Sequence, residues 1–195
     1  MKFTKVVLFQ KGKKIIDFAT ARNRALTKAK EEWVLFLDTD EVLSRDLKKE
    51  ILEQDKNNKV DGYFIKRIDY FWGKWLRFGE TGNIRLLRLG RKGAGIWKRK
   101  VHEFWDIKNS GNLKNVILHY PEWSINKINA YSEIDAKEFS SFHFYDLLKP
   151  VGKFFLNYFL KLGLLDGLAG FIHAYLMSFQ SLVVRIKQYD FTKNS

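Results

Sequence analysis

The chain has 195 residues, a length that suits one domain or one domain with an appendage. It contains no cysteine, which excludes a disulfide framework, thiolate catalysis and thiolate zinc sites. Lysine and arginine number 35 against 22 acidic residues, and the formal net charge of +13 favours anionic partners. No helix-turn-helix, zinc-finger or RNA-binding motif accompanies this charge. Anionic lipid or a phosphorylated substrate is therefore expected, and nucleic acid is not.

The first third of the chain predicts strands alternating with helices. In chain order the pattern predicts a strand at 4–9, a helix at 18–32 capped by Asp17, a strand at 33–38 and a charged helix at 45–57 that begins after Ser44. The run at 33–38 is almost continuously apolar, which is typical of a strand covered on both faces.

The middle of the chain predicts several more strands, at 62–71, 83–89, 100–107 and 115–121. This order predicts an α/β core with a strand-rich second half. Helical spacing begins at Ser124.

The last part of the chain is unusually apolar. Eighteen residues without a formal charge lie between Asp166 and Arg185. As a helix they would span roughly 27 Å, slightly less than a hydrocarbon core of about 30 Å. Flanking lysines and several polar residues favour a helical hairpin lying on an anionic membrane surface over a membrane span. A core helix packed on the α/β body and a dimer interface are the alternatives.

Two aspartates follow the apolar strand in the stretch "EEWVLFLDTDEVLS". Asp38 and Asp40 would repel each other, and ligands of open α/β sheets bind where strands end. Oxygen ligands of this kind suit Mg²⁺ or Mn²⁺ bridging to a diphosphate. The preceding helix carries Arg22 and Asn23, which could meet a phosphate or a base. A solvated acidic turn is the alternative.

The stretch "DFATARNRALTKAKEEWVLFLDTDEVLSRDL" resembles the central block of the family-2 glycosyltransferases, inverting enzymes of the GT-A fold. The stretches "GYFIKRIDYFWGKW", "NIRLLRL", "KVHEFW" and "ILHYPEWS" resemble one branch, the bacterial lipopolysaccharide-core (lipooligosaccharide) glucosyltransferases. The resemblance implies an α/β chain in which a GT-A (nucleotide-diphospho-sugar transferase) sheet is followed by C-terminal amphipathic helices. A partial catalytic domain would occupy residues 1–123, and a membrane-associating helical region 124–195.

The resemblance also implies roles for single residues. Asp38 would lie near the ribose and the metal, and Asp40 would bind the metal against the diphosphate. Arg22, with Asn23 beside it, would hold the nucleotide sugar. Glu103 would be the catalytic base, and His119 would lie near the metal or the diphosphate.

Other readings of these residues are less specific. Arg22 could be one of many surface arginines, and His119 a hydrogen-bonded core residue. His102 would point away from Glu103, because neighbouring strand residues face opposite ways. Four tryptophans could form a platform for a saccharide or pack in the core: Trp72, Trp75, Trp97 and Trp105.

The chemistry of inverting transfer needs only groups of these kinds. One base takes the proton of the acceptor hydroxyl, and a cation stabilises the departing diphosphate. The expected reaction moves a hexose, with glucose as the favoured candidate, from a nucleoside-diphosphate sugar such as UDP-glucose to a lipid-linked saccharide. The expected context is cell-envelope polysaccharide biosynthesis. The expected location is cytoplasmic, peripheral on the inner face of the cytoplasmic membrane. The sequence leaves open whether the protein forms a homo-oligomer.

One departure from the family concerns the start of the chain. Family members begin with further βα units before the strand that residues 4–9 match. We therefore expect the chain to lack the first one or two units, and with them much of the nucleobase pocket. A truncated, non-catalytic module that only binds membranes is then one alternative function. A haloacid-dehalogenase-type phosphatase with Asp38 as nucleophile is another.

Overall fold

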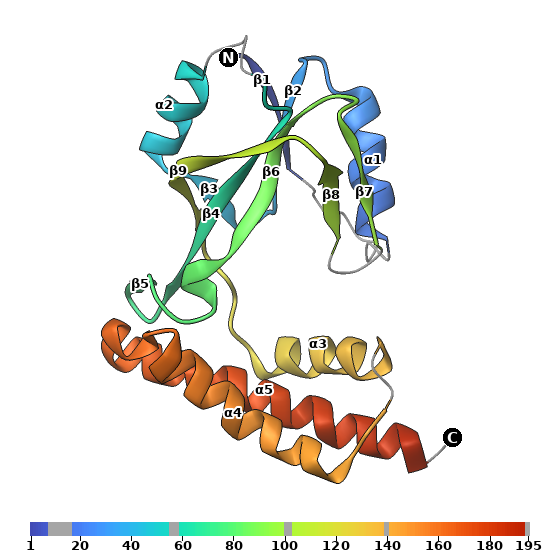
Figure 1. The fold of residues 1–195 in the computed structure, drawn as a ribbon, viewed down its shortest axis with the longest axis vertical. Coiled ribbons are helices and arrows are strands. Elements are labelled where there is room, and N and C mark those ends of the chain that lie inside the picture. The colour runs from blue at the N-terminus through green and yellow to red at the C-terminus, as the bar shows by residue number, and fades with distance from the viewer. Residues whose placement is uncertain (8–16, 55–58, 100–102, 139–140, 194–195) are drawn as a thin grey trace. The chain divides into compact units, whose positions relative to one another are not determined.

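The computed structural model describes residues 1–7, 17–54, 59–99, 103–138 and 141–193. These residues form two compact units (Figure 1). The first contains Met1–Ile68 and Ile84–His119, and the second contains Asp69–Asn83 and Tyr120–Ser195. A hairpin from the middle of the chain thus groups with the C-terminal helices. The functional division at residue 123 stays a prediction.

The first unit is built on a mixed sheet in the order β1-β2-β6-β4-β9-β3. Its strands are β1 (Phe3–Val7), β2 (Trp33–Leu37), β6 (Arg85–Arg91), β4 (Gly62–Phe71), β9 (Ser110–His119) and β3 (Glu41–Leu43). β1 runs parallel to β2, whereas the β2–β6, β6–β4 and β9–β3 pairs are antiparallel. The predicted α/β class with a GT-A-like sheet and C-terminal helices is confirmed.

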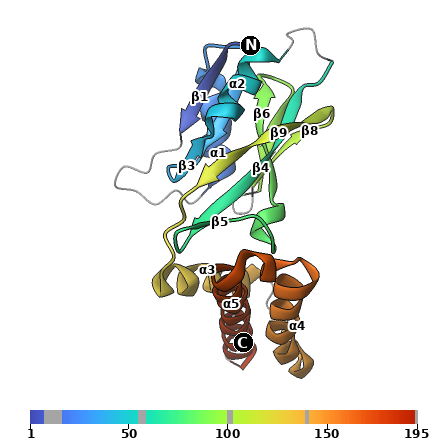
Figure 2. The same ribbon diagram turned by 90° about the vertical axis from the view of Figure 1, so that its left-hand side faces the viewer.

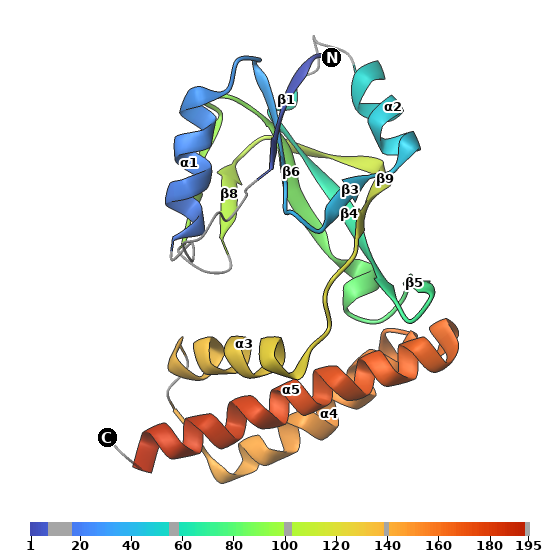
Figure 3. The ribbon, with the colours of Figure 1, turned by 180° about the vertical axis from the view of Figure 1, so that it is seen from behind.

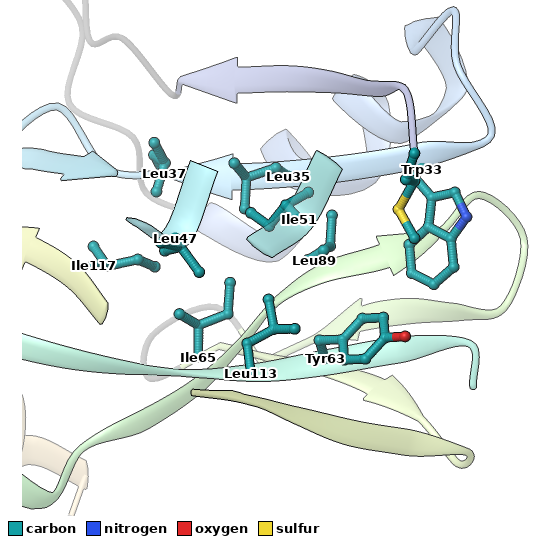
Figure 4. Packing of buried hydrophobic residues seen from close by; sticks show 11 residues of the cluster. Trp33, Leu35, Leu37, Leu47, Ile51, Tyr63, Ile65, Leu89, Leu113 and Ile117 are labelled. Atoms are coloured by element: carbon teal, nitrogen blue, oxygen red, sulfur yellow. The ribbon is translucent and has the colours of Figure 1, made fainter. Parts of the chain in front are cut away.

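Three elements cover the two faces of this sheet. Helix α1 (Phe18–Lys28) and the hairpin of β7 (Gly95–Lys98) and β8 (Phe104–Ile107) lie on one face, and α2 (Arg45–Glu53) lies on the other (Figure 3). The β2 side chains alternate between the two cores. Leu35 and Leu37 pack with Leu47 and Ile51 of α2 (Figure 4), while Phe36 faces the α1 side. Every β2 residue is buried, so the prediction of cover on both faces is confirmed.

Both predicted helix starts are confirmed. The Asp17 carboxylate accepts the backbone N–H of Thr20, and the Ser44 hydroxyl accepts that of Leu47, so each residue caps its helix. The first helix ends at Lys28, earlier than the predicted residue 32, because Ala29 adopts an extended backbone. The chain needs these extended residues to turn into β2 at Trp33.

The second unit contains β5 (Lys74–Leu76), a 3₁₀ turn (Thr81–Asn83) and the C-terminal helices. The helices are α3 (Ile125–Glu138), α4 (Lys149–Phe155) and α5 (Gly167–Lys193). A 3₁₀ segment (Phe144–Leu148) leads into α4, and a π-helical turn (Leu156–Leu160) and a second 3₁₀ turn (Gly163–Asp166) join α4 to α5. Both α3 and α4 pack against α5 (Figure 2).

Buried polar groups tie the tip of the α4–α5 hairpin to the 77–80 loop of the same unit. The Asp166 carboxylate accepts the backbone N–H groups of Arg77 and Phe78 at 3.0 and 2.9 Å. The Asn157 side chain accepts the backbone N–H of Glu80 at 2.8 Å. These bonds hold the irregular tip, whose own helical hydrogen bonding is interrupted.

Candidate active site

The two predicted aspartates lie in a tight turn between β2 and β3. The backbone N–H of Glu41 donates to the Asp38 carbonyl at 3.1 Å, which closes a four-residue turn. The Glu41 carboxylate in turn accepts the backbone N–H of Asp38 at 3.0 Å. The turn therefore holds the Asp38 and Asp40 side chains at the end of the most deeply buried strand, about one-third exposed each.

Two arginines bind Asp38 from different elements. Arg22 of α1 contacts Oδ1 at 2.7 Å, and Arg88 of β6 contacts Oδ2 at 2.6 Å. Burial raises the pKa of the Asp38 carboxyl. The charges of Arg88 and Arg22 lower this pKa, and because their combined effect is larger, the pKa lies below its ordinary value. Asp38 is therefore ionised and held between two cations.

Glu41 extends this charged cluster. Its Oε1 lies 3.4 Å from Arg88 and 3.4 Å from Arg67 of β4. Burial lowers the pKa of Arg88, whereas Asp38, Glu41 and Glu103 together raise it above its ordinary value. The positive charges of three arginines thus offset the negative charges of three carboxylates beneath the turn: Arg22, Arg67 and Arg88 with Asp38, Glu41 and Glu103.

Arg22 links the turn to Glu103. Its Nε and Nη2 lie 3.1 and 3.0 Å from Glu103 Oε1, while Nη2 also binds Asp38. The guanidinium carbon lies 4.6 Å from the Trp97 ring centre and 5.5 Å from that of Phe36. Arg22 is 1% exposed, so it is not a surface helix residue. Its Nη1 is buried and has no hydrogen-bond partner within the part of the chain that the structure describes.

Asn23 makes a different set of contacts. Its side-chain amide donates to the Trp97 carbonyl and accepts the Trp97 backbone N–H, both at 2.9 Å. These bonds join α1 to β7. The predicted contact of Asn23 with a nucleotide sugar stays a prediction.

Glu103 lies directly before β8 and beside a pocket of about 190 Å³ that Arg88, Trp97 and Phe104 also line. Its Oε1 accepts from Arg22, whereas Oε2 has no hydrogen-bond partner among the residues described. One carboxylate oxygen is thus held and the other can meet a ligand. His102 lies outside the described residues.

Asp40 pairs with His119 rather than with an arginine. The Asp40 Oδ2 atom lies 3.3 Å from Nε2 of His119, and Glu41 is the register partner of His119 in the β3–β9 pair. The hydrogen bond from His119 lowers the pKa of Asp40, although burial opposes it. The structure thus brings together Asp40 and His119, two of the residues predicted to lie near the metal or the diphosphate.

The donors present decide how a divalent cation could be held. Both Asp38 oxygens accept from arginines, and the described parts of the chain contain no group of three or more His, Cys, Asp or Glu side chains that could hold a metal ion. Asp40 and His119 offer one carboxylate oxygen and one imidazole nitrogen. A carboxylate oxygen suits Mg²⁺ or Mn²⁺, whereas the imidazole is hydrogen-bonded to Asp40 and is not one of the oxygen ligands that Mg²⁺ prefers. The metal roles of Asp38, Asp40 and His119 stay predictions.

Three residues of the cluster were not predicted from the sequence: Arg88, Glu41 and Arg67. A signal for Arg88 existed, because it interrupts the apolar run "LLRLG" and a buried arginine requires carboxylate partners. The partners could not be assigned, because they lie on other strands.

The family model described as glycosyl transferase family 2 matches residues 3–113, more than half of the chain. The chain belongs to glycosyl transferase family 2. The match covers every residue of the charged cluster and ends before the C-terminal helices α3, α4 and α5. No curated protein is similar enough to match. Membership of this family replaces the phosphatase alternative, in which Asp38 would have been a nucleophile.

The tryptophans of this glycosyltransferase serve different purposes. Trp97 and Trp105 are buried and stacked, with ring centres 5.3 Å apart. They pack against Phe36 in the core, and Arg22 lies over Trp97, which supports the core alternative for these two residues. Trp72, by contrast, is 70% exposed.

Proposed function

We propose that this glycosyltransferase moves a hexose from a nucleoside-diphosphate sugar to a lipid-linked saccharide with inversion at the anomeric carbon. One observation carries the proposal. Arg22 holds the turn aspartate Asp38 and the carboxylate Glu103 in one cluster, although the three residues come from separate parts of the chain. Such a cluster places a candidate base beside the turn where the donor diphosphate would bind.

Each residue of the cluster has a role in this reaction. The Oε2 atom of Glu103 takes the proton of the attacking acceptor hydroxyl, and Arg22 orients it through Oε1. Asp40 and His119 would hold the divalent cation that family-2 enzymes commonly use, and that cation would neutralise the leaving diphosphate. Arg22 and Arg88 keep Asp38 ionised and the turn in place.

The donor and the reaction context rest on the resemblance to the lipopolysaccharide-core branch. It favours glucose as the hexose, UDP-glucose as the donor and cell-envelope polysaccharide biosynthesis as the context. The formal net charge of +13 supports phosphorylated partners.

The helical unit supports a lipid-linked acceptor and a membrane location. Seven large apolar residues of α5 recur every three or four positions, and all are exposed: Leu168, Phe171, Tyr175, Phe179, Leu182, Ile186 and Tyr189. Between residues 147 and 189 the only acidic side chain is Asp166, which is buried, whereas five are basic. An apolar stripe with basic neighbours favours the surface of an anionic leaflet, here the inner face of the cytoplasmic membrane.

The stretch Gly163–Lys193 is also long and apolar enough to cross a membrane, by length and composition alone. Core helices pass the same test. We propose peripheral binding because α5 packs against α3 and α4 along its other faces.

Calorimetric titration of UDP into the 195-residue chain, with and without Mn²⁺, tests the donor site. Binding that requires Mn²⁺ is expected. A folded sample that binds no UDP under either condition would contradict the proposal and favour the non-catalytic membrane module.

The first variant to compare is Asp40→Asn. It should abolish the Mn²⁺ dependence of UDP binding, because the amide is a much poorer cation ligand than the carboxylate. Asp46→Asn, on the exposed face of α2, is the matched control and should bind as the wild type does. Equal Mn²⁺-dependent binding in both variants would remove Asp40 from the metal site.

Glu103→Gln tests the base. The variant keeps an oxygen for Arg22, so UDP binding should persist, while transfer should fall by a factor of roughly 10² or more. The exposed Glu53→Gln serves as the control. Near-normal turnover in Glu103→Gln would mean that another group takes the proton.

A further inference from the structure

The polarity of α5 is inverted relative to that of an ordinary surface helix. Its apolar stripe faces outward, whereas a polar stripe at helical spacing lies toward the neighbouring helices: Gln180, Ser181, Arg185 and Gln188. Gln188 is fully buried, and the other three are partly buried. A helix in water would place these two stripes the other way round. The inversion suits a unit whose outer face meets lipid and whose inner face meets something polar.

The polar stripe lines a groove within the helical unit. The groove has a volume of about 980 Å³, at the upper end of the ~300–1,000 Å³ typical of ligand sites. Both α3 and α4 pack on α5, and residues of all three helices contribute to the lining (Figure 2). Lys149 and Lys153 reach it from α4.

Among the three cations of the groove, Arg185 contacts no carboxylate directly in the described part of the chain, although Asp146 is close enough to interact with its charge. Its Nη1 donates to the neutral amide oxygen of Gln188 at 2.6 Å, and no ion pair joins it to an acidic residue in the described part of the chain. Its Nε–H is buried and has no hydrogen-bond acceptor there. By contrast, Lys149 binds Asp146 at 2.6 Å and Lys153 binds Glu80 at 2.5 Å.

The lining holds more cations than carboxylates, although Glu80, which lies outside the lining, neutralises Lys153. Asp135 and Asp146 are the two carboxylates of the lining, against three cationic side chains. A buried guanidinium N–H without an acceptor is costly, and a phosphate oxygen satisfies it with a charge-assisted hydrogen bond. The groove therefore suits a monoanionic or dianionic group attached to polar, hydroxyl-rich material.

We propose that this groove binds the phosphate-bearing headgroup of the lipid-linked acceptor, with Arg185 as the phosphate ligand. The proposal rests on the proposed function, because it assigns that reaction's acceptor to a site. The lipid chains would leave the groove toward the membrane, along the exposed apolar stripe of α5. A groove lined by both polar and apolar side chains, next to an apolar outer surface, is what an amphiphilic ligand requires.

The test titrates the full chain with dihexanoyl phosphatidic acid, a short-chain lipid phosphate kept in its monomeric form. Saturable binding is expected, with a change in the Nε–Hε resonance of Arg185 in NMR spectra. Arg185→Gln should weaken binding by roughly tenfold or more, because a charge-assisted hydrogen bond is lost. Lys187→Gln removes the same charge two residues away, from a side chain that does not line the groove, and should leave binding unchanged.

Two further ligands show whether the groove recognises the phosphate charge, the lipid chains or both. Dihexanoyl phosphatidylcholine has the same chains without net charge, and inorganic phosphate has the charge without chains. Both should bind more weakly than the lipid phosphate. Equal weakening by Arg185→Gln and Lys187→Gln would reveal nonspecific attraction and overturn the proposal. Inorganic phosphate binding as well as the lipid phosphate would overturn it too.

The outcome is separable from that of the donor site. Arg185→Gln should bind UDP with Mn²⁺ as the wild type does, because Arg185 is no part of the charged cluster. If UDP fails to bind while the lipid phosphate binds through Arg185, the proposed transferase reaction fails and the headgroup site stands. The reverse result removes the headgroup site alone.

Discussion

Arg88 shows how a single buried charge organises the candidate active site. It contacts both Asp38 and Glu41, the first and last residues of the turn that also carries Asp40. A buried arginine is tolerated only when carboxylates compensate it. The same contacts compensate two carboxylates at the end of an apolar strand.

Replacing Arg88 by alanine should therefore cost about 3–5 kcal/mol of unfolding free energy, because it leaves buried carboxylates without their partner. The control is Arg85→Ala on the same strand, whose side chain is exposed and whose loss should change stability by no more than about 0.5 kcal/mol. Urea denaturation followed by tryptophan fluorescence measures both. Equal stability of the two variants would show that the cluster contributes nothing to the fold.

Arg22 and Asn23 are neighbours in sequence with separate roles in the structure. Arg22 enters the charged cluster, whereas the Asn23 amide is bonded to the backbone of β7. From the sequence, both were expected near the nucleotide sugar, because both could meet a phosphate or a base. Side-chain chemistry alone could not separate them, since the separation depends on which element packs against each face of α1.

At the scale of elements, β2 could be predicted from its local sequence pattern, whereas the tip of the α4–α5 hairpin could not. The apolar run of β2 and the caps at Asp17 and Ser44 were readable, because each depends on residues adjacent in sequence. The hairpin tip was not readable. Its π-helical and 3₁₀ turns depend on Asn157 and Asp166 bonding to the distant 77–80 loop.

Gly170 makes the close approach at this tip. A Cβ atom there would lie 2.0 Å from the Gly163 carbonyl oxygen and 2.9 Å from the Asp166 Cβ. Gly170→Ala should therefore destabilise the helical unit by about 1–3 kcal/mol, as overpacking does. Gly152→Ala in α4 meets nothing within 4 Å and should instead stabilise it by about 0.5–1 kcal/mol.

Thermal unfolding followed by far-UV circular dichroism compares these two glycine variants. The opposite signs are the informative result, because both changes add one methyl group to a helix. A Gly170→Ala protein as stable as Gly152→Ala would mean that the tip is not closely packed.

At the scale of the whole molecule, the exposed apolar stripe and the basic charge point to the same partner. Large continuous apolar surfaces are rare on proteins that stay in water. Here the stripe runs along α5 from Leu168 to Tyr189, and the only acidic residue of the surrounding segment is buried. Membrane binding should therefore combine apolar burial with attraction to anionic lipid.

Two isoleucines of the helical unit test this binding. Ile186 lies on the stripe and is 50% exposed, whereas Ile125 of α3 lies off it and is 74% exposed. Ile186→Glu should reduce flotation with phosphatidylglycerol vesicles by roughly tenfold or more, because it forces a carboxylate toward hydrocarbon. Ile125→Glu should float as the wild type does, and equal loss in both would assign the effect to net charge.

The sequence alone determined the α/β class, the main strands, the caps of the first two helices and the place of Asp38 and Asp40 after a buried strand, because period, capping and motif are properties of neighbouring residues. Tertiary structure decided the rest. Only the packing of α1, β6 and β8 around the turn shows that Asp38 is held by Arg22 and Arg88, and that Arg22 reaches Glu103. Only the packing of three helices shows which stripe of α5 faces outward and which lines a groove. Both depend on contacts between residues far apart in the chain, which no local pattern encodes.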